Sequence, residues 1–173
     1  DLIPRPGKEK SGIGQEGFLN LGAGSIRRNE TRYFCFGTST ESDIEAAKNT
    51  RNYYFFEFDP LGESAISPRF YGTSNNETAT SVVRTPDQGF LIGGFAVIGG
   101  REQPYLVKTN ANGILEWEVP YTRAYSTQVN TRVESVLPTN DGGFIAVVTT
   151  SEINLGREIG LIKFDPAGFF EWQ

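Results

Sequence analysis

Carboxylate side chains are the strongest candidates for chemistry in this sequence. A glycosidase needs two Asp or Glu side chains about 5 to 9.5 Å apart, flanking the bond that is cleaved. The acids on segments that lead into the expected inner strands are Glu77, Asp87, Glu134 and Asp141. Asp87 and Asp141 occupy equivalent turn positions in two sequence repeats, which is typical of acids that cap turns. Glu134 aligns with Thr80 and Ala23, so it stands outside the repeat and is the better candidate for a functional residue.

Other groups that catalyse reactions are scarce. The sequence contains no histidine, which excludes Ser-His-Asp triads, Cys-His dyads and His-ligated zinc sites. The single cysteine, Cys35, lies in the apolar run RYFCFG, which indicates a small core residue rather than a nucleophile. The turns DPLG and DPAG each offer one carboxylate, whereas calcium prefers roughly six to eight oxygen ligands. We therefore assign no catalytic residue and expect neither a cofactor nor a metal site.

The composition is typical of a turn-rich β-protein. The 173 residues include 20 glycines, 9 prolines and 13% aromatic residues, and a chain of this length can bury one core. The formal net charge of -5 argues against a nucleic-acid partner, because phosphate binding requires clustered Lys and Arg. No apolar run approaches the roughly 20 residues of a membrane-spanning helix. Residues 1–16 are rich in proline, glycine and charge, which predicts a flexible linker.

An internal repeat defines the rest of the chain. The segments FFEFDPLGESAI (55–66), LVKTNANGILEW (106–117) and LIKFDPAGFFEW (161–172) align without gaps. A second block recurs upstream of each segment, as SVVRTPDQGFLIGGF from residue 81, SVLPTNDGGFIAVVT from residue 135 and a degraded version from residue 24. The positions that we assign to the structural repeat are Asp59, Gly62, Asn110, Gly113, Trp117, Asp165, Gly168 and Trp172. Two blocks in the same order, three times over, indicate tandem structural units.

Each unit resolves into four short strands joined by turns. An Asp or Asn at the start of the third turn caps it with its side chain, and the following glycine accepts the left-handed conformation that closes a hairpin. The sequence therefore predicts an all-β, β-propeller-like domain over residues 17–173, with blades at approximately 22–72, 79–121 and 131–173. Residues 17–21 are predicted to add a strand to the short final blade.

Three blades are fewer than the roughly 4 to 8 of natural propellers. Three arrangements fit this count: a fragment of a longer propeller, half of a ring that a second copy completes, or an open stack. An open stack leaves apolar faces and strand edges exposed, which favours the fragment and the self-associating half-ring. In each of them the tryptophan of the fourth strand is expected to pack between neighbouring blades.

The pattern K-x-D-x-x-G-x-x-x-W, written in full from Lys163 to Trp172, resembles the repeats of bacterial secreted and lipid-anchored β-propellers, including quinoprotein-like propellers. The resemblance spans about residues 22–173, and the first copy departs from it by lacking both Asp-Gly-Gly and the tryptophan. It implies a secreted, cell-surface or periplasmic bacterial protein, compatible with a lipid tether upstream of the linker. Nothing in the sequence matches a quinone-cofactor site, so that chemistry is not carried over.

Binding residues are expected where the repeat is interrupted. Residues 41–52 form a long insertion in the first unit, and residues 121–132 connect the second and third units. Tyrosine and arginine are favoured at interfaces. The candidate binding residues are Tyr121, Arg123, Tyr125, Arg132 and Glu134.

Two functions remain open at the level of the sequence. The leading hypothesis is a non-enzymatic propeller module, secreted or at the cell surface, that binds a protein or a glycan. The alternative is a carbohydrate-active enzyme, a glycoside hydrolase or lyase, with Asp or Glu side chains at the centre of the ring.

Overall fold

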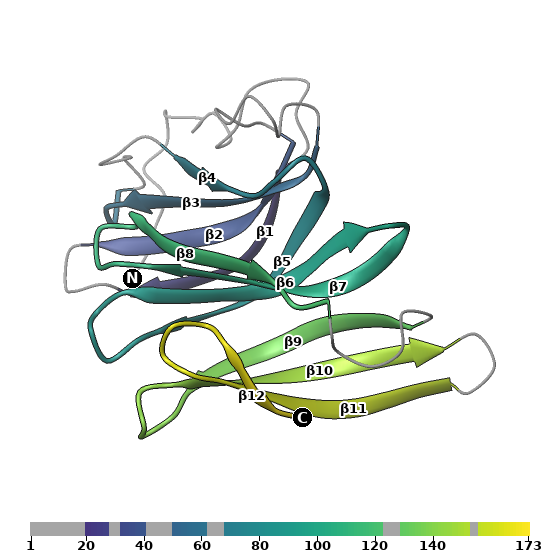
Figure 1. Cartoon of the computed structure of the whole chain (residues 1–173). Helices are drawn as coiled ribbons and strands as arrows, with labels where there is room; N and C mark the ends of the chain where they lie inside the picture. Colours follow the sequence, from purple (N-terminus) through teal and green to yellow (C-terminus); the bar gives the residue numbers. More distant parts are fainter. Residues whose placement is uncertain (1–19, 28–31, 41–49, 62–67, 123–128, 153–155) are drawn as a thin grey trace.

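The protein consists of three four-stranded antiparallel sheets, each with its strands in chain order (Figure 1). The computed structural model describes residues 20–27, 32–40, 50–61, 68–122, 129–152 and 156–173. Within these ranges the all-β prediction is confirmed, and there is no helix that is long and apolar enough to cross a membrane.

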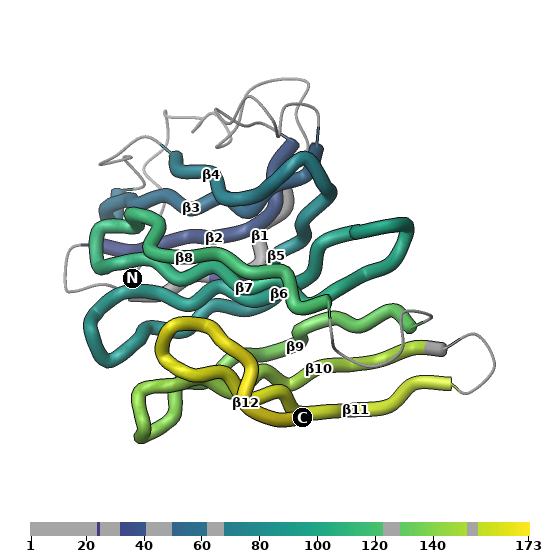
Figure 2. Tube along the Cα trace, in the orientation of Figure 1, coloured from purple at the N-terminus to yellow at the C-terminus, as the bar shows by residue number. Residues whose placement is uncertain are grey.

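The three sheets follow one another along the chain, with short hairpins between most strands (Figure 2). Sheet A contains β1 (Asn20–Arg27), β2 (Tyr33–Ser39), β3 (Asn52–Phe58) and β4 (Arg69–Tyr71). Sheet B contains β5 (Asn76–Arg84), β6 (Phe90–Ile98), β7 (Arg101–Thr109) and β8 (Leu115–Pro120). Sheet C contains β9 (Asn130–Pro138), β10 (Phe144–Glu152), β11 (Gly156–Phe164) and β12 (Phe170–Trp172).

The sheets stack face to face, with sheet B in the middle (Figure 1). One core lies between sheets A and B and includes Phe34, Phe55 and Phe90. The other core lies between sheets B and C and includes Leu106 and Phe144. Because side chains alternate across a strand, each sheet contributes one set of residues to each side.

All three sheets stack in the same sense. We call the face of sheet B that points toward sheet C its front face, which carries Leu91, Leu106 and Trp117. Its back face points toward sheet A and carries Phe90, Ile92 and Val107. The same register positions define the faces of sheets A and C, so the front face of each sheet meets the back face of the next one.

The first strands of the three sheets lie beside one another, β1 next to β5 and β5 next to β9. Each of them carries a β-bulge at the same repeat position, at Ala23, Thr80 and Glu134. A bulge of this kind bends its strand and increases the local twist. The described residues form a stack of three sheets, and no closed ring is seen among them.

Residues 17–21 do not form the predicted extra strand of the final unit as far as the structure describes them. Asn20 and Leu21 belong to β1 and pair with Ser39 and Thr38 of sheet A, while residues 17–19 lie outside the described ranges, as do residues 1–16. The first strands begin upstream of the predicted apolar runs because their leading residues form backbone pairs with the second strands. Such pairing does not require apolar side chains, so the hydrophobic pattern of the sequence does not reveal it.

The turns between the third and fourth strands share one cap. The Oδ1 atoms of Asn110 and Asp165 accept hydrogen bonds from the backbone N–H two residues later, both at 2.9 Å. Gly113 and Gly168 then adopt φ angles of +69° and +84°, which side-chain-bearing residues rarely accept. Asp59 makes the same 2.9 Å contact with the N–H of Leu61, and Gly62 lies outside the described residues.

Candidate functional site

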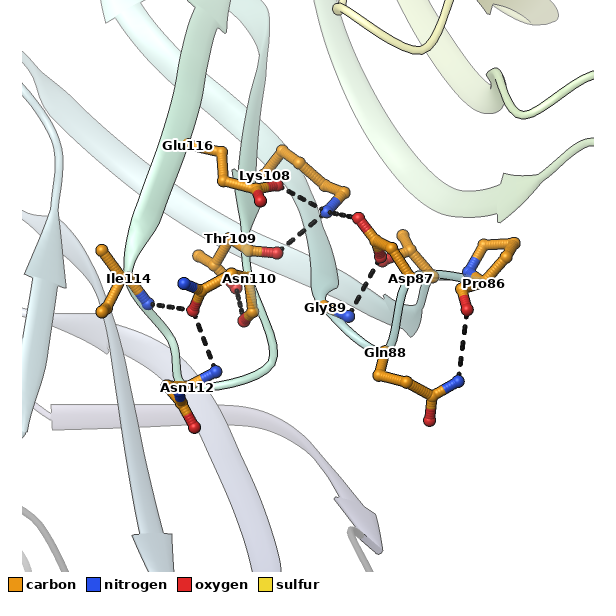
Figure 3. A network of polar contacts seen from close by, with 11 residues as sticks. Pro86, Asp87, Gln88, Gly89, Lys108, Thr109, Asn110, Asn112, Ile114 and Glu116 are labelled. Carbon is orange, nitrogen blue, oxygen red and sulfur yellow. Dashed lines mark hydrogen bonds and ion pairs between the residues drawn. The ribbon is translucent and has the colours of Figure 1, made fainter.

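A buried lysine stands at the centre of the polar network in sheet B (Figure 3). The Nζ atom of Lys108 lies 2.7 Å from Asp87 Oδ2 and 2.7 Å from Glu116 Oε2, and it donates to the carbonyl of Thr109 at 2.9 Å. Burial alone would raise the pKa of Asp87, but hydrogen bonds from Lys108, Thr85 and the Gly89 amide hold it at about 2. Asp87 therefore stays ionised and ties one turn of the sheet to another.

Sheet C repeats this network. Lys163 Nζ lies 3.1 Å from Asp141 Oδ2 and 3.0 Å from Glu171 Oε2. Hydrogen bonds from Thr139, the Gly143 amide and Lys163 lower the pKa of Asp141 to about 2. Because the same lysine–acid arrangement occurs in two sheets, Asp87 and Asp141 stabilise equivalent turns.

An aromatic contact recurs at both interfaces between sheets. Phe34 of sheet A meets the edge of Phe90 of sheet B, with ring centroids 4.6 Å apart. Trp117 of sheet B lies 6.0 Å from Phe144 of sheet C and also covers Gly168, where an added Cβ would meet its ring at 3.0 Å. In each case a front-face aromatic ring packs on the aromatic residue that begins the next sheet's second strand.

An asparagine outside the two aligned sequence blocks also recurs at both interfaces. Asn76 Oδ1 accepts the N–H of Arg51 at 3.0 Å, and Asn130 Oδ1 accepts the N–H of Glu102 at 3.0 Å. Asn76 thus binds the residue just before β3, and Asn130 binds the second residue of β7. The sequence does contain this regularity, since both asparagines lie five residues before a Ser-Val pair. It is hard to recognise because it consists of one polar residue in a segment of low hydrophobicity.

Two glutamates lie in the polar part of the interface between sheets A and B. Glu77 is fully buried, and its Oε1 accepts hydrogen bonds from the hydroxyl and the N–H of Thr73, at 2.6 and 3.3 Å. Burial raises the pKa of Glu77, and these hydrogen bonds offset only part of the effect. Burial likewise raises the pKa of Glu118, whose Oε2 accepts the hydroxyl of Tyr105 at 2.7 Å.

The candidate binding residues that the structure describes, Tyr121, Arg132 and Glu134, have different surroundings. Tyr121 is buried and packs on Phe164 and Phe170, with ring centroids 5.5 and 5.2 Å away, so it belongs to the core of sheet C. Tyr121 comes directly after β8, which ends at Pro120. The sequence alone does not reveal which sheet the tyrosine ring packs against. Arg123 and Tyr125 lie outside the described residues.

Arg132 bridges sheets B and C. Its guanidinium forms an ion pair with Glu102 through two hydrogen bonds, the second at 2.6 Å, and lies 4.9 Å from the ring centroid of Phe95. Arg132 therefore helps to hold these two sheets together. Glu134 is exposed at the bulge of β9. Thr80 occupies the equivalent bulge of β5, and its hydroxyl donates a hydrogen bond to the carbonyl of Val133 in sheet C at 2.6 Å.

The front face of sheet C is the most exposed apolar surface of the described residues. Leu137, Ile159, Leu161 and Trp172 are 53%, 82%, 46% and 46% exposed. They lie on the same side of the sheet because Leu137 pairs with Ile145, Ile145 with Lys163, and Lys163 with Trp172. An apolar surface of this kind on a protein in water usually marks a site of interaction. Sequence patterning alone could not identify it, since the equivalent residues of sheet B are covered.

Among the described residues there is no group of three or more His, Cys, Asp or Glu side chains that could hold a metal ion. Comparison of the sequence with protein-family models gives no match. Comparison with curated proteins likewise gives none.

Proposed function

We propose that the chain is a non-catalytic, propeller-like module that binds a protein through the front face of sheet C. The observation that carries this proposal is the row of exposed apolar side chains on that face, Leu137, Ile159, Leu161 and Trp172. A protein partner would remove them from water, at a gain of roughly 25 cal/mol for each Å² buried.

The chemistry of the face favours a protein over a glycan. Sugars bind by stacking on aromatic rings between polar groups. Most of this face is aliphatic instead: Ile145 and Val147 lie on β10, and Val147 pairs with Leu161 of β11. Interfaces between proteins commonly have an apolar centre and a charged rim. Asp141 and Glu171, the exposed partners of the buried Lys163, supply such charges near Trp172.

The arrangement of the sheets supports a propeller-like architecture. Successive four-stranded meanders stack front to back, and their first strands lie beside one another. Strands of that order converge toward an axis in a propeller. The secreted or cell-surface location stays a proposal that rests on the resemblance of the repeat.

The buried position of Glu77 weighs against the carbohydrate-active alternative. A polymeric substrate must touch both acids, yet Glu77 is fully buried between two sheets. Asp87 and Asp141 are each held by a lysine, and Glu134 is the remaining candidate acid.

A photo-crosslinking amino acid at Ile159, the most exposed residue of the front face, tests the proposal directly. We expect it to capture a protein from an extract of the native host, and Leu161→Glu on the same chain should abolish the capture. The same photo-crosslinking residue at Leu61, an exposed apolar turn residue of sheet A, is the matched control.

Two further assays separate the classes of function. The chain should bind no glycan on an array and hydrolyse no chromogenic glycoside. Glycan binding or hydrolysis that is lost in Glu134→Gln would contradict the proposal and restore the enzyme alternative.

A further inference from the structure

The front face of sheet C has two counterparts inside the molecule, and both are covered in the same way. The front face of sheet A, with Phe34 and Phe55, packs on the back face of sheet B. The front face of sheet B, with Leu106 and Trp117, packs on the back face of sheet C. The interior of the protein thus shows twice what covers such a face, namely the back face of another four-stranded sheet.

An aromatic contact at each of the two interfaces indicates which residue a covering back face should carry. Phe34 packs on Phe90, and Trp117 packs on Phe144. Phe90 and Phe144 both begin the second strand of their sheet. The residue at this position in sheet A is Tyr33, which begins β2. Trp172 corresponds to Trp117, and Tyr33 corresponds to Phe144. By this equivalence, Tyr33 on the back face of sheet A is the residue on which Trp172 would pack.

The back face of sheet A has the required composition. It carries Tyr33, Cys35, Tyr54, Phe56 and Phe58, which occupy the register positions of the back face of sheet B. Tyr33 stacks on Phe58 at 5.6 Å, and Tyr54 stacks on Phe56 at 5.7 Å. Tyr33, Cys35 and Phe58 are partly exposed, whereas Tyr54 and Phe56 are buried.

We propose that a second copy of the chain docks head to tail, with the front face of sheet C of each copy against the back face of sheet A of the other. Two copies of three sheets then close a ring of six, within the range of natural propellers. Such a contact between two different faces forms a closed pair when its rotation completes the circle. Trp172 of one copy lies on Tyr33 of the second copy. The inference rests on the proposed function, because it names the protein that the front face of sheet C binds.

Light scattering over a range of protein concentrations tests the assembly. We expect a mass of two 19.1 kDa chains that falls toward one chain on dilution. A monomer at every concentration, or an assembly that keeps growing beyond two chains, overturns the closed pair.

Variants of the two faces test which surfaces meet. Leu161→Glu on the front face and Tyr33→Asp on the back face should each raise the dissociation constant of the pair at least about tenfold. Leu61→Glu, at an exposed turn outside both faces, should leave it unchanged. A mixture of the Leu161→Glu and Tyr33→Asp chains should form a mixed pair, since one of its two contacts then contains no substitution. If Tyr33→Asp folds and still pairs like the unsubstituted chain, the head-to-tail contact is wrong.

Cys35 provides a second readout that leaves the back face unaltered. Its thiol is partly exposed on the back face of sheet A, so alkylation should be slower in the pair than in the monomer. Leu161→Glu lies on another sheet, and it should accelerate the alkylation of Cys35 to the rate of a dilute sample. An alkylation rate that depends on neither the substitution nor the concentration overturns the inference.

The outcomes also separate this inference from the proposed function. A monomeric chain whose Ile159 photo-crosslinks to a different protein retains the proposed function and loses the second copy as partner. A monomeric chain that captures no protein loses both.

Discussion

Sheets B and C are built from the same repeat, yet one has both faces covered and the other has only one. Trp117 and Trp172 hold the same position opposite a lysine of the third strand. Trp117 packs on Phe144 and Gly168, whereas Trp172 is 46% exposed. The same residue type therefore packs in an interface in one sheet and is half-exposed in the other.

The difference shows that the repeat determines which residues lie on one face of a sheet, but not whether another sheet covers that face. A four-stranded sheet with apolar residues on both sides cannot shield itself, and stacking supplies the missing cover. Whether a given face is core or binding surface depends on what stands next to it. The predictions below compare equivalent positions in the two sheets, from the largest expected effect to the smallest.

The largest difference is expected between the two tryptophans. Trp117→Ala removes a ring wedged between two sheets and should lower the free energy of unfolding by about 3 kcal/mol. Trp172→Ala removes a half-exposed ring and should lower it by less than about 1 kcal/mol. Denaturant unfolding at low protein concentration, where the chain is monomeric, measures both. Equal losses would show that the front face of sheet C is covered within one chain.

Gly93 of sheet B and Val147 of sheet C form the second pair. A Cβ at Gly93 would lie 2.6 Å from Val136 Cγ1 and 2.9 Å from Val133 Cγ1, both in sheet C. Gly93→Ala should therefore lower the free energy of unfolding by about 2 kcal/mol through overpacking. Val147→Ala, on the front face of sheet C, should cost less than about 1 kcal/mol. Thermal unfolding of the two variants, side by side, checks the contrast.

Glu77 and Thr131 hold the same register position at the two interfaces, so only the interface between sheets A and B contains an acid there. Since the pKa of Glu77 is raised above its ordinary value of 4.5, the folded state binds its proton more tightly than the unfolded state. Stability from this group is fully present below about pH 4.5 and is lost as the pH rises through the raised pKa.

Glu77→Gln keeps an acceptor for Thr73 and removes this titration. The variant should be more stable than the original chain at pH 7, and its free energy of unfolding should change less between pH 5 and 7. Unfolding in urea across that range measures the slope.

A smaller effect is expected at the turns that precede β6 and β10. Gln88 adopts φ +71°, while its counterpart Gly142 adopts φ +85°. A side chain in this region costs roughly 1 kcal/mol. Gln88→Gly should therefore raise the free energy of unfolding by about 0.5 kcal/mol, and Gly142→Gln should lower it by a similar amount. A loss of stability in Gln88→Gly would show that its side-chain contact with the Pro86 carbonyl outweighs the backbone cost.

Acid should destabilise both sheets through the same network. The pKa values of Asp87 and Asp141 are lowered to about 2, below their ordinary 3.8. Their contribution is therefore fully present above about pH 4 and is lost as the pH falls toward 2. Unfolding measured from pH 4 to pH 2 should show a loss of stability that is smaller in Asp87→Asn, with Asp141→Asn as the matched variant in sheet C.

Local features of this protein could be predicted from the sequence because they depend on residues close together in the chain. The four-stranded units follow from alternating apolar residues and from turns in which Asn110 and Asp165 cap the backbone two residues later. Gly113 and Gly168 were recognisable because a hairpin there requires a left-handed residue. Each of these arguments needs no more than about a dozen consecutive residues.

Only the tertiary structure decided which of these residues are covered. The burial of Tyr121, the pairing of Arg132 with Glu102 and the raised pKa of Glu77 depend on strands from other units. The repeat determined that the fourth strand of sheet C ends in a tryptophan with an apolar row beside it. The stacking of the three sheets left that row exposed, because burial depends on what lies opposite a face and not on the residues that compose it.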